Sequence, residues 1–185
     1  SKSDFIFVVS SVNFMVPHVG SGGGDDKQAT IKKDDAWTVF LKEREELIEF
    51  WDGLDKAVFV LTGDLHNSFA IKITDNVYEF ASGPHNSINH APMKDEGGRP
   101  SNGKFKYGPR SCDIRWSSYA MADIPRANRT FPHYCVVQVN NVFNNPLERD
   151  GERWFAFPHP HVIFQFHDAY TGDLRYSETY LLGLD

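Results

Sequence analysis

Short apolar runs separated by polar turns occupy most of the chain, and one longer segment repeats its apolar residues at helical spacing. Runs rich in Val, Ile and Phe predict buried strands at residues 5–9, 57–62, 68–74 and 77–81. Asp75 and Asn76, between the last two runs, predict a tight hairpin. Residues 10–33 are polar and Gly-rich at their centre, which predicts a long loop.

The helical spacing begins at Asp34. Apolar side chains share one stripe at Trp37, Phe40, Leu41, Leu47, Ile48 and Trp51. Asp34 or Asp35 is a suitable N-cap, and Gly53 is a suitable end. We therefore expect an amphipathic helix of about five turns, with Glu43 and Arg44 on its solvated face. A buried ion pair is the alternative for these two residues.

Three segments of different character follow from this pattern. Residues 1–82 form a motif-bearing α/β part, because a strand, a helix and further strands alternate there. Residues 83–134 are rich in Gly, Pro, Asn and Ser but keep several aromatic residues, so we expect an ordered irregular excursion rather than a linker. Residues 135–185 return to strands, expected at 135–143, 154–157, 162–167 and 175–182.

The composition limits the possible partners. The 185 residues carry a formal net charge of −6, which disfavours a nucleic-acid partner. No apolar run approaches the roughly 20 residues that a membrane span needs. Cys112 and Cys135 could form one bridge or stay reduced. Because the chain starts without Met or a signal peptide, just before an interior strand, we expect it to be part of a longer protein.

The break in the strand pattern at Gly63-Asp64-Leu65-His66-Asn67 is the strongest candidate for chemistry. Ligands of open α/β sheets bind at the carboxyl ends of strands, where this turn is expected. On an extended segment Asp64 and His66 project to the same side. Carboxylate oxygen and imidazole nitrogen can each hold a metal, and two adjacent metals activate water for phosphoryl transfer. The alternative is an Asp in a turn beside a surface His.

Four motifs in order resemble the C-terminal part of the PhoD-type alkaline phosphatases, within the calcineurin-like metallophosphoesterases. They are Asp35-x-Trp37, Glu43-Arg44, Gly63-Asp64-x-His66 and Glu79-Phe80-Ala81-Ser82-Gly83-Pro84. The resemblance implies a layered α/β/β/α fold, of which this chain is the C-terminal, β-rich portion with one long helix. It also implies hydrolysis of small phosphate mono- or diesters with iron and calcium as the metal pair, manganese or zinc remaining open.

By the same resemblance Asp64 and His66 would be metal ligands, and Asn67 would orient a ligand or meet substrate beside His66. Asp35 would be a further metal residue, although a helix N-cap explains it as well. The family's early ligand motifs are absent from this sequence. The resemblance therefore implies that an N-terminal half of the same protein, attached or as a separate chain, completes the site. It also implies a secreted or periplasmic protein.

Other polar residues are weaker candidates. His85 and His90 follow the third strand on a loop that could fold back over Asp64 and His66, where either could contact a ligand or the substrate phosphate. Arg110 could clamp a phosphate. A surface His and an Arg paired with the acidic surface are the alternatives, and the latter also applies to Arg115. His159 and His161 fit the entry to an edge strand better than a metal site. A second function stays open: a non-catalytic, β-rich binding or structural module with an incomplete site.

Overall fold

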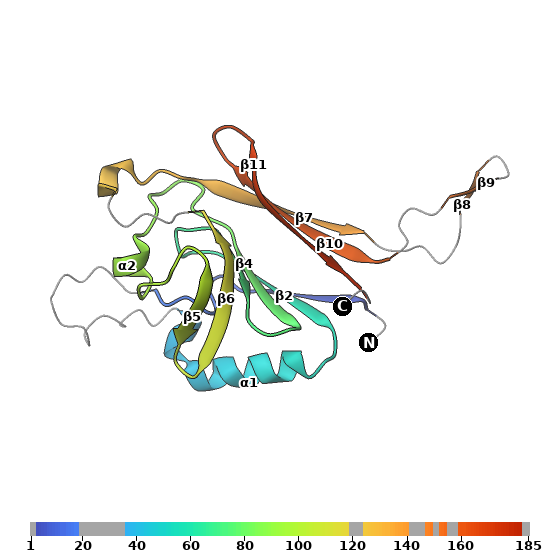
Figure 1. Cartoon of the computed structure of the whole chain (residues 1–185), viewed down its shortest axis with the longest axis horizontal. Helices are drawn as coiled ribbons and strands as arrows, with labels where there is room; N and C mark the ends of the chain where they lie inside the picture. The colour runs from blue at the N-terminus through green and yellow to red at the C-terminus, as the bar shows by residue number, and fades with distance from the viewer. Residues whose placement is uncertain are drawn as a thin grey trace.

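A computed structural model describes residues 3–18, 36–118, 124–140, 147–149, 152–154 and 159–182. The described chain is mixed α/β and mostly sheet, with two sheets facing each other and helix α1 (Leu41–Asp52) along the larger one (Figure 1). The expected α/β class is therefore confirmed.

The larger sheet has six strands in the order β1-β2-β4-β3-β6-β5. Their bounds are β1 (Phe5–Val9), β2 (Ala57–Thr62), β3 (Phe69–Lys72), β4 (Val77–Ala81), β5 (Gly103–Tyr107) and β6 (Arg110–Ser117). β1, β2 and β4 run parallel to one another. β3 runs antiparallel to both of its neighbours, β4 and β6, so β6 has the same direction as β4. The carboxyl ends of β1, β2, β4 and β6 therefore share one edge. The predicted strands and the β3–β4 hairpin are confirmed, β3 being shorter than expected.

The smaller sheet is antiparallel, with β10 (His161–Asp168) between β7 (His133–Asn140) and β11 (Leu174–Leu181). Its strands confirm three of the four runs expected in the C-terminal segment. Residues 141–143 and 155–157 of the predicted strands lie outside the described part of the chain. β8 (Leu147–Arg149) and β9 (Glu152–Trp154) pair as a separate two-stranded sheet.

Aromatic side chains fill the space between the two sheets. The ring centroids of Phe80 in β4 and Phe164 in β10 are 3.6 Å apart, with the ring planes 4° from parallel. Phe59 in β2 also contacts Phe164, at 5.0 Å. Alternate residues of β10 point into this core, as the strand period of two requires.

Helix α1 covers the opposite face of the larger sheet, where Ile48 and Trp51 join the core (Figure 1). The prediction that the helix begins at Asp34 is wrong. A short 3-10 helix, η1 (Trp37–Val39), comes first, and Phe40 interrupts the path with φ −111° and ψ 51° before α1 starts. The proposed N-caps Asp34 and Asp35 lie outside the described residues. Gly53 ends the helix as expected.

Arg44 is a second correction to the helix, because its side chain is fully buried rather than solvated. It takes the place in the apolar stripe between Leu41 and Ile48. Its guanidinium donates hydrogen bonds to Glu45 Oε1 at 2.7 Å and to the Tyr107 carbonyl at 3.0 Å. These partners compensate in part for the loss of water around the buried charge, because Nη1 of Arg44 has no hydrogen-bond partner among the described residues. Glu43 is exposed, as expected.

The segment 83–134 is more regular than the irregular excursion that was expected. β5 and β6 lie within it and extend the larger sheet beyond β3. It also contains the short helix α2 (Pro92–Asp95) and the 3-10 helix η2 (Arg126–Asn128). Its strands escape a search for apolar alternation because "GKFKY" and "RSCDIRWS" are mostly polar.

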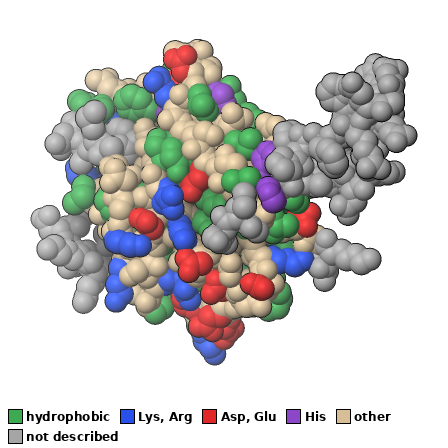
Figure 2. Space-filling view, turned by 45° about the vertical axis from the view of Figure 1, so that its right-hand side comes forward, with side chains coloured by type: hydrophobic (Ala, Val, Ile, Leu, Met, Phe, Trp, Pro, Cys, Tyr) green, Lys and Arg blue, Asp and Glu red, His purple; other side chains and the backbone are tan. Residues whose placement is uncertain are grey.

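Two expectations drawn from composition can be compared with the structure. Among the described residues, no helix is both long and apolar enough to cross a membrane. On the face shown in Figure 2, Lys and Arg side chains alternate with Asp and Glu and form no continuous basic area.

Both cysteines are free thiols: Cys112 lies in the core on the α1 side, and Cys135 packs between the sheets.

Candidate functional site

Three loops meet at the edge where the parallel strands end. They are residues 10–18 after β1, residues 63–68 after β2 and residues 82–91 after β4. Ser68 joins two of them, because its hydroxyl donates to the Gly83 carbonyl at 2.8 Å and accepts from the Gly83 amide at 2.9 Å. This edge is where open α/β sheets bind their ligands.

The turn after β2 turns two polar side chains outward around one buried apolar residue. Asp64 and His66 both have left-handed backbones, with φ of 66° and 55°. Leu65 between them is fully buried and donates its amide to the Gly63 carbonyl at 2.8 Å. The expectation of an extended segment is therefore wrong. Left-handed conformations are uncommon outside glycine and cluster at functional sites, where surrounding structure enforces them.

The ring of His66 is fixed by polar contacts of its Nδ1 nitrogen. Its Nδ1 lies 2.9 Å from the carbonyl oxygen of Ile88 and 3.3 Å from the Ser87 hydroxyl. A carbonyl can only accept, so this bond requires the proton on Nδ1 and leaves the lone pair on Nε2. Metal-binding histidines usually have this arrangement, with the second ring nitrogen donating to a carbonyl or carboxylate.

Two further histidines connect Asp64 with His66. Asp64 Oδ2 lies 3.7 Å from Nδ1 of His18, and the rings of His18 and His90 are 4.8 Å apart. The ring of His90 in turn stacks on that of His66 at 4.3 Å. Although the turn is not extended, Asp64 and His66 thus belong to one continuous cluster. The carboxylate of Asp64 is 44% exposed and faces solvent at this edge.

A buried carboxylate fixes the segment that carries His18. Glu79, in the middle of β4, accepts hydrogen bonds from the amides of Phe14 at 2.6 Å and Met15 at 2.9 Å. It also accepts from the Thr62 hydroxyl at 2.9 Å. Complete burial raises the pKa of Glu79, and the three donors act in the opposite direction. Glu79 therefore holds the chain after β1 against the sheet.

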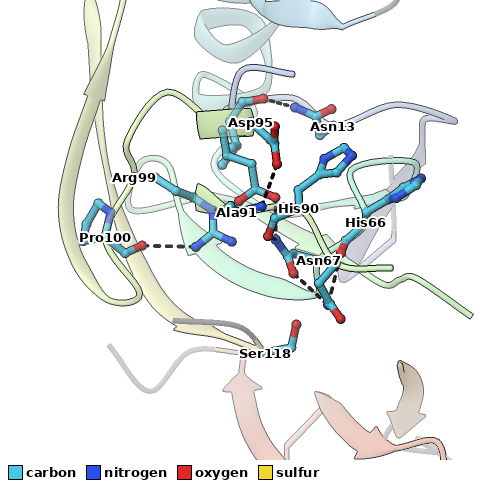
Figure 3. Close-up of polar contacts among 12 residues, drawn as sticks. Asn13, His66, Asn67, His90, Ala91, Asp95, Arg99, Pro100 and Ser118 are labelled. Carbon is cyan, nitrogen blue, oxygen red and sulfur yellow. Dashed lines mark hydrogen bonds and ion pairs between the residues drawn. The ribbon is translucent and has the colours of Figure 1, made fainter. Parts of the chain in front are cut away.

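Asn67 is buried next to the cluster that Asp64, His18, His90 and His66 form. Its amide donates to Glu96 Oε1 at 2.6 Å and to the His90 carbonyl at 3.1 Å, and its own oxygen accepts from Asn89 at 2.8 Å. In Figure 3 these bonds lie between Arg99 on one side and His66 on the other. Asn67 thus joins the turn after β2 to the segment that carries His90.

Glu96 and Arg99 form a fully buried ion pair beneath this network. Burial raises the pKa of Glu96 to about 7, although Arg99 and the bond from Asn67 act in the opposite direction. Next to the pair, Gly97 has φ of 65°, and a Cβ there would meet Pro17 Cγ at 2.5 Å. The close approach at Gly97 brings the end of α2 against the residue before His18.

The remaining predicted residues are not all at this edge. His85 is exposed on the loop after β4, near the cluster. Arg110 lies at the start of β6, the end opposite to Ser117, which pairs with Phe69. Arg110 donates to Glu45 on α1 at 2.5 Å. The structure therefore does not bring Arg110 together with Asp64. Asp35 lies outside the described residues.

Sequence patterns gave no role to His18, Glu79 or Glu96. His18 lies within the predicted loop of residues 10–33, and Glu79 appeared only as the first residue of the motif Glu79-Phe80-Ala81-Ser82-Gly83-Pro84, with no structural role assigned to it. Nothing in the sequence pairs Glu96 with Asn67. Within the described part of the chain, no three His, Cys, Asp or Glu side chains form a group that could hold a metal ion.

Comparison of the chain with protein-family models, with curated proteins and with solved structures gives no match in any of the three.

Proposed function

We propose that this chain supplies part of a two-metal site for the hydrolysis of small phosphate mono- or diesters, in the α/β/β/α arrangement of the metallophosphoesterases. The observation that carries the proposal is the bond from His66 Nδ1 to the Ile88 carbonyl. It fixes the ring and leaves Nε2 as the metal-binding nitrogen, two residues from the exposed carboxylate of Asp64.

The donor set fits a hard or borderline cation. Asp64 would contribute carboxylate oxygen and His66 imidazole nitrogen, which suit iron, manganese and zinc, and the carboxylate also suits calcium. A bound metal pair supplies an activated water and neutralises phosphoryl charge. Asn67 and Glu79 support the loops that carry these ligands. Further ligands would come from an N-terminal half of the same protein, attached or as a separate chain, in a secreted or periplasmic setting.

Hydrolysis of p-nitrophenyl phosphate and bis(p-nitrophenyl) phosphate by this chain together with that N-terminal half tests the proposal. Removing a supporting partner of a metal ligand costs roughly 10–100-fold, so Asp64→Asn and His66→Ala should each lower kcat/KM by at least about 100-fold. His161→Ala is the matched control. Its Nδ1 also faces a carbonyl, that of His159, but its Nε2 is bonded to Asn140. Equal activity of the site variants and the wild type would exclude Asp64 and His66 from the catalytic site, and no hydrolysis by the wild type would favour the non-catalytic module.

A further inference from the structure

Which nitrogen of the His66 ring can bind a metal depends on where the ring carries its proton. A neutral imidazole has one ring proton, and only the other nitrogen has a lone pair for a cation. The Ile88 carbonyl oxygen, 2.9 Å from Nδ1, can only accept a hydrogen bond and so favours the proton on Nδ1. The Ser87 hydroxyl, 3.3 Å from the same nitrogen, can donate or accept and favours neither form. The direction of the Ile88 carbonyl therefore decides the tautomer.

The peptide group between Ile88 and Asn89 is oriented from its other end. The amide of Asn89 donates to the carbonyl of Arg129 at 2.8 Å. This peptide is trans, so its N–H and its C=O point in opposite directions. Because the amide points to Arg129, the carbonyl of the same peptide, which belongs to Ile88, points away from Arg129 and meets the His66 ring on the other side.

Arg129 is itself a fixed partner for this peptide. It follows η2, where its amide donates to the Arg126 carbonyl at 3.2 Å. Its side chain donates from Nε to the Ile124 carbonyl at 2.9 Å, and its guanidinium lies 3.9 Å from the carboxylate of Asp95. A rotation of the Ile88–Asn89 peptide would therefore break a bond to an anchored residue.

The side chain of Asn89 joins the same peptide to the turn after β2. Asn89 is 1% exposed, and its Nδ2 donates to Asn67 Oδ1 at 2.8 Å and to the His66 carbonyl at 3.2 Å. Its Oδ1 accepts from the amide of Phe131 at 2.7 Å, which ties it to the chain before β7. His66 is thus held at two points: its backbone by the side chain of Asn89, and its ring by the Ile88 carbonyl.

We infer that Asn89 is a positioning residue for His66: its amide and its side chain hold the Ile88 carbonyl against Nδ1, so that Nε2 keeps the lone pair that binds a metal. Asn89 is buried and acts only through the ring of His66. The consequence for metal binding rests on the proposed function, whereas the tautomer is measured without any metal.

Long-range ¹H–¹⁵N NMR spectra of the neutral histidine rings of the full chain test the inference, because protonated and free ring nitrogens differ widely in ¹⁵N shift. The signals that disappear in His66→Ala belong to His66, and in the wild type they should show the proton on Nδ1. One net hydrogen bond changes an equilibrium by roughly two- to tenfold, so Asn89→Ala should lower the ratio of the Nδ1-protonated to the Nε2-protonated form by that factor. Asn89→Asp keeps the acceptor for the Phe131 amide but loses the donor to His66, and it should lower the ratio too.

Two control variants separate this role from a general loss of stability. Asn76→Ala removes another asparagine that donates to a backbone carbonyl, that of Asp52 at 3.2 Å, just before β4 and away from the candidate site. It should leave the tautomer unchanged. Ser87→Ala should also leave it unchanged, because the hydroxyl favours neither form. An Nε2-protonated ring in the wild type, an unchanged ratio in both Asn89 variants, or an equal change in Ser87→Ala overturns the inference.

Titration with Mn²⁺ of this chain together with its N-terminal half distinguishes the inference from the proposed function. Loss of an outer partner of a metal-binding His costs about 10–100-fold, so Asn89→Ala, which loosens that partner without removing it, should weaken Mn²⁺ binding by roughly three- to tenfold. In a His66→Ala background the same change should cause no further loss, because Asn89 acts through the ring. An equal loss in both backgrounds overturns the inference. If only the proposed function fails, Asn89→Ala still changes the tautomer, and none of the variants changes Mn²⁺ binding.

Discussion

Asn67 donates a 2.6 Å hydrogen bond to Oε1 of Glu96, and both side chains are almost completely buried. Asn67 belongs to the turn that presents His66, whereas Glu96, which directly follows α2, is 29 residues further along the chain than Asn67. The contact shows that buried polar groups, and not apolar packing alone, hold the turn that carries His66 in place. Such a network stabilises only if every member finds a partner.

Asn67→Ala should therefore destabilise the protein markedly. The change leaves Glu96 Oε1 and one donor of Asn89 with fewer partners, and a buried polar group left unsatisfied costs about 1–3 kcal/mol. We expect the free energy of unfolding in urea to fall by about 2–4 kcal/mol. Asn86→Ala, at an exposed position of the adjoining loop, should stay within about 0.5 kcal/mol of wild type. Similar losses for the two variants would argue against the network.

Glu96 should make the stability depend on pH. The unfolded chain releases this proton near the ordinary pKa of 4.5, whereas the folded chain keeps it until about 7. The folded state therefore binds more protons between these values, and its stability falls as the pH rises through that window. Relative to Glu96→Gln, wild type should lose up to about 1.4 kcal/mol per pH unit between pH 5 and 7 in urea titrations. A difference independent of pH contradicts the raised pKa.

The central strands could be predicted well from the sequence, whereas the buried residues that hold the loops of the candidate site could not. β1 and β2 are almost entirely apolar and β4 is interrupted only by Glu79, and local pattern alone specifies such strands. β5 and β6 are polar on alternate or successive positions, and their place in the sheet depends on the pairing of β6 with β3 and of β5 with β6. The start of α1 was misplaced because Trp37 and Phe40 continue the helical spacing through a 3-10 turn.

The same limit applies to the candidate site. Gly63-Asp64-Leu65-His66 identified the turn because its residue types interrupt an apolar run. The clustering of His18 and His90 around it arises from loops brought together by parallel strands, and no local pattern encodes that contact. The left-handed backbones of Asp64 and His66, on either side of the buried Leu65, likewise have no local sequence signal.

Phe164→Ala should test the packing of the two sheets. The side chain is fully buried and stacks on Phe80 at 3.6 Å, so its removal leaves a large cavity. Truncation of a buried Phe costs about 3–5 kcal/mol, and we expect a loss of that size in urea unfolding. Val136→Ala, on the exposed part of β7, serves as the control and should cost far less. A loss below about 1 kcal/mol at Phe164 would be incompatible with sheets in contact.

Both cysteines should react slowly in the folded protein. Burial raises the pKa of Cys112 and of Cys135 to about 12, and only the thiolate is nucleophilic. At pH 8 the thiolate fraction is then roughly a thousandfold below that of an exposed thiol. Iodoacetamide should label the native chain at less than about one-hundredth of the rate in urea, as followed by mass spectrometry. Rapid labelling of either thiol without denaturant would refute the burial described for it.

The central claim is that Asp64 and His66 bind metal, and calorimetric titration of this chain together with its N-terminal half with Mn²⁺ measures it directly. Asp64→Asn and His66→Ala should each weaken Mn²⁺ binding by at least about tenfold, since each removes one proposed ligand. His161→Ala should match the wild type, because Asn140 already occupies its Nε2. Equal affinity in all four proteins, or no Mn²⁺ binding by the wild type, would contradict the account.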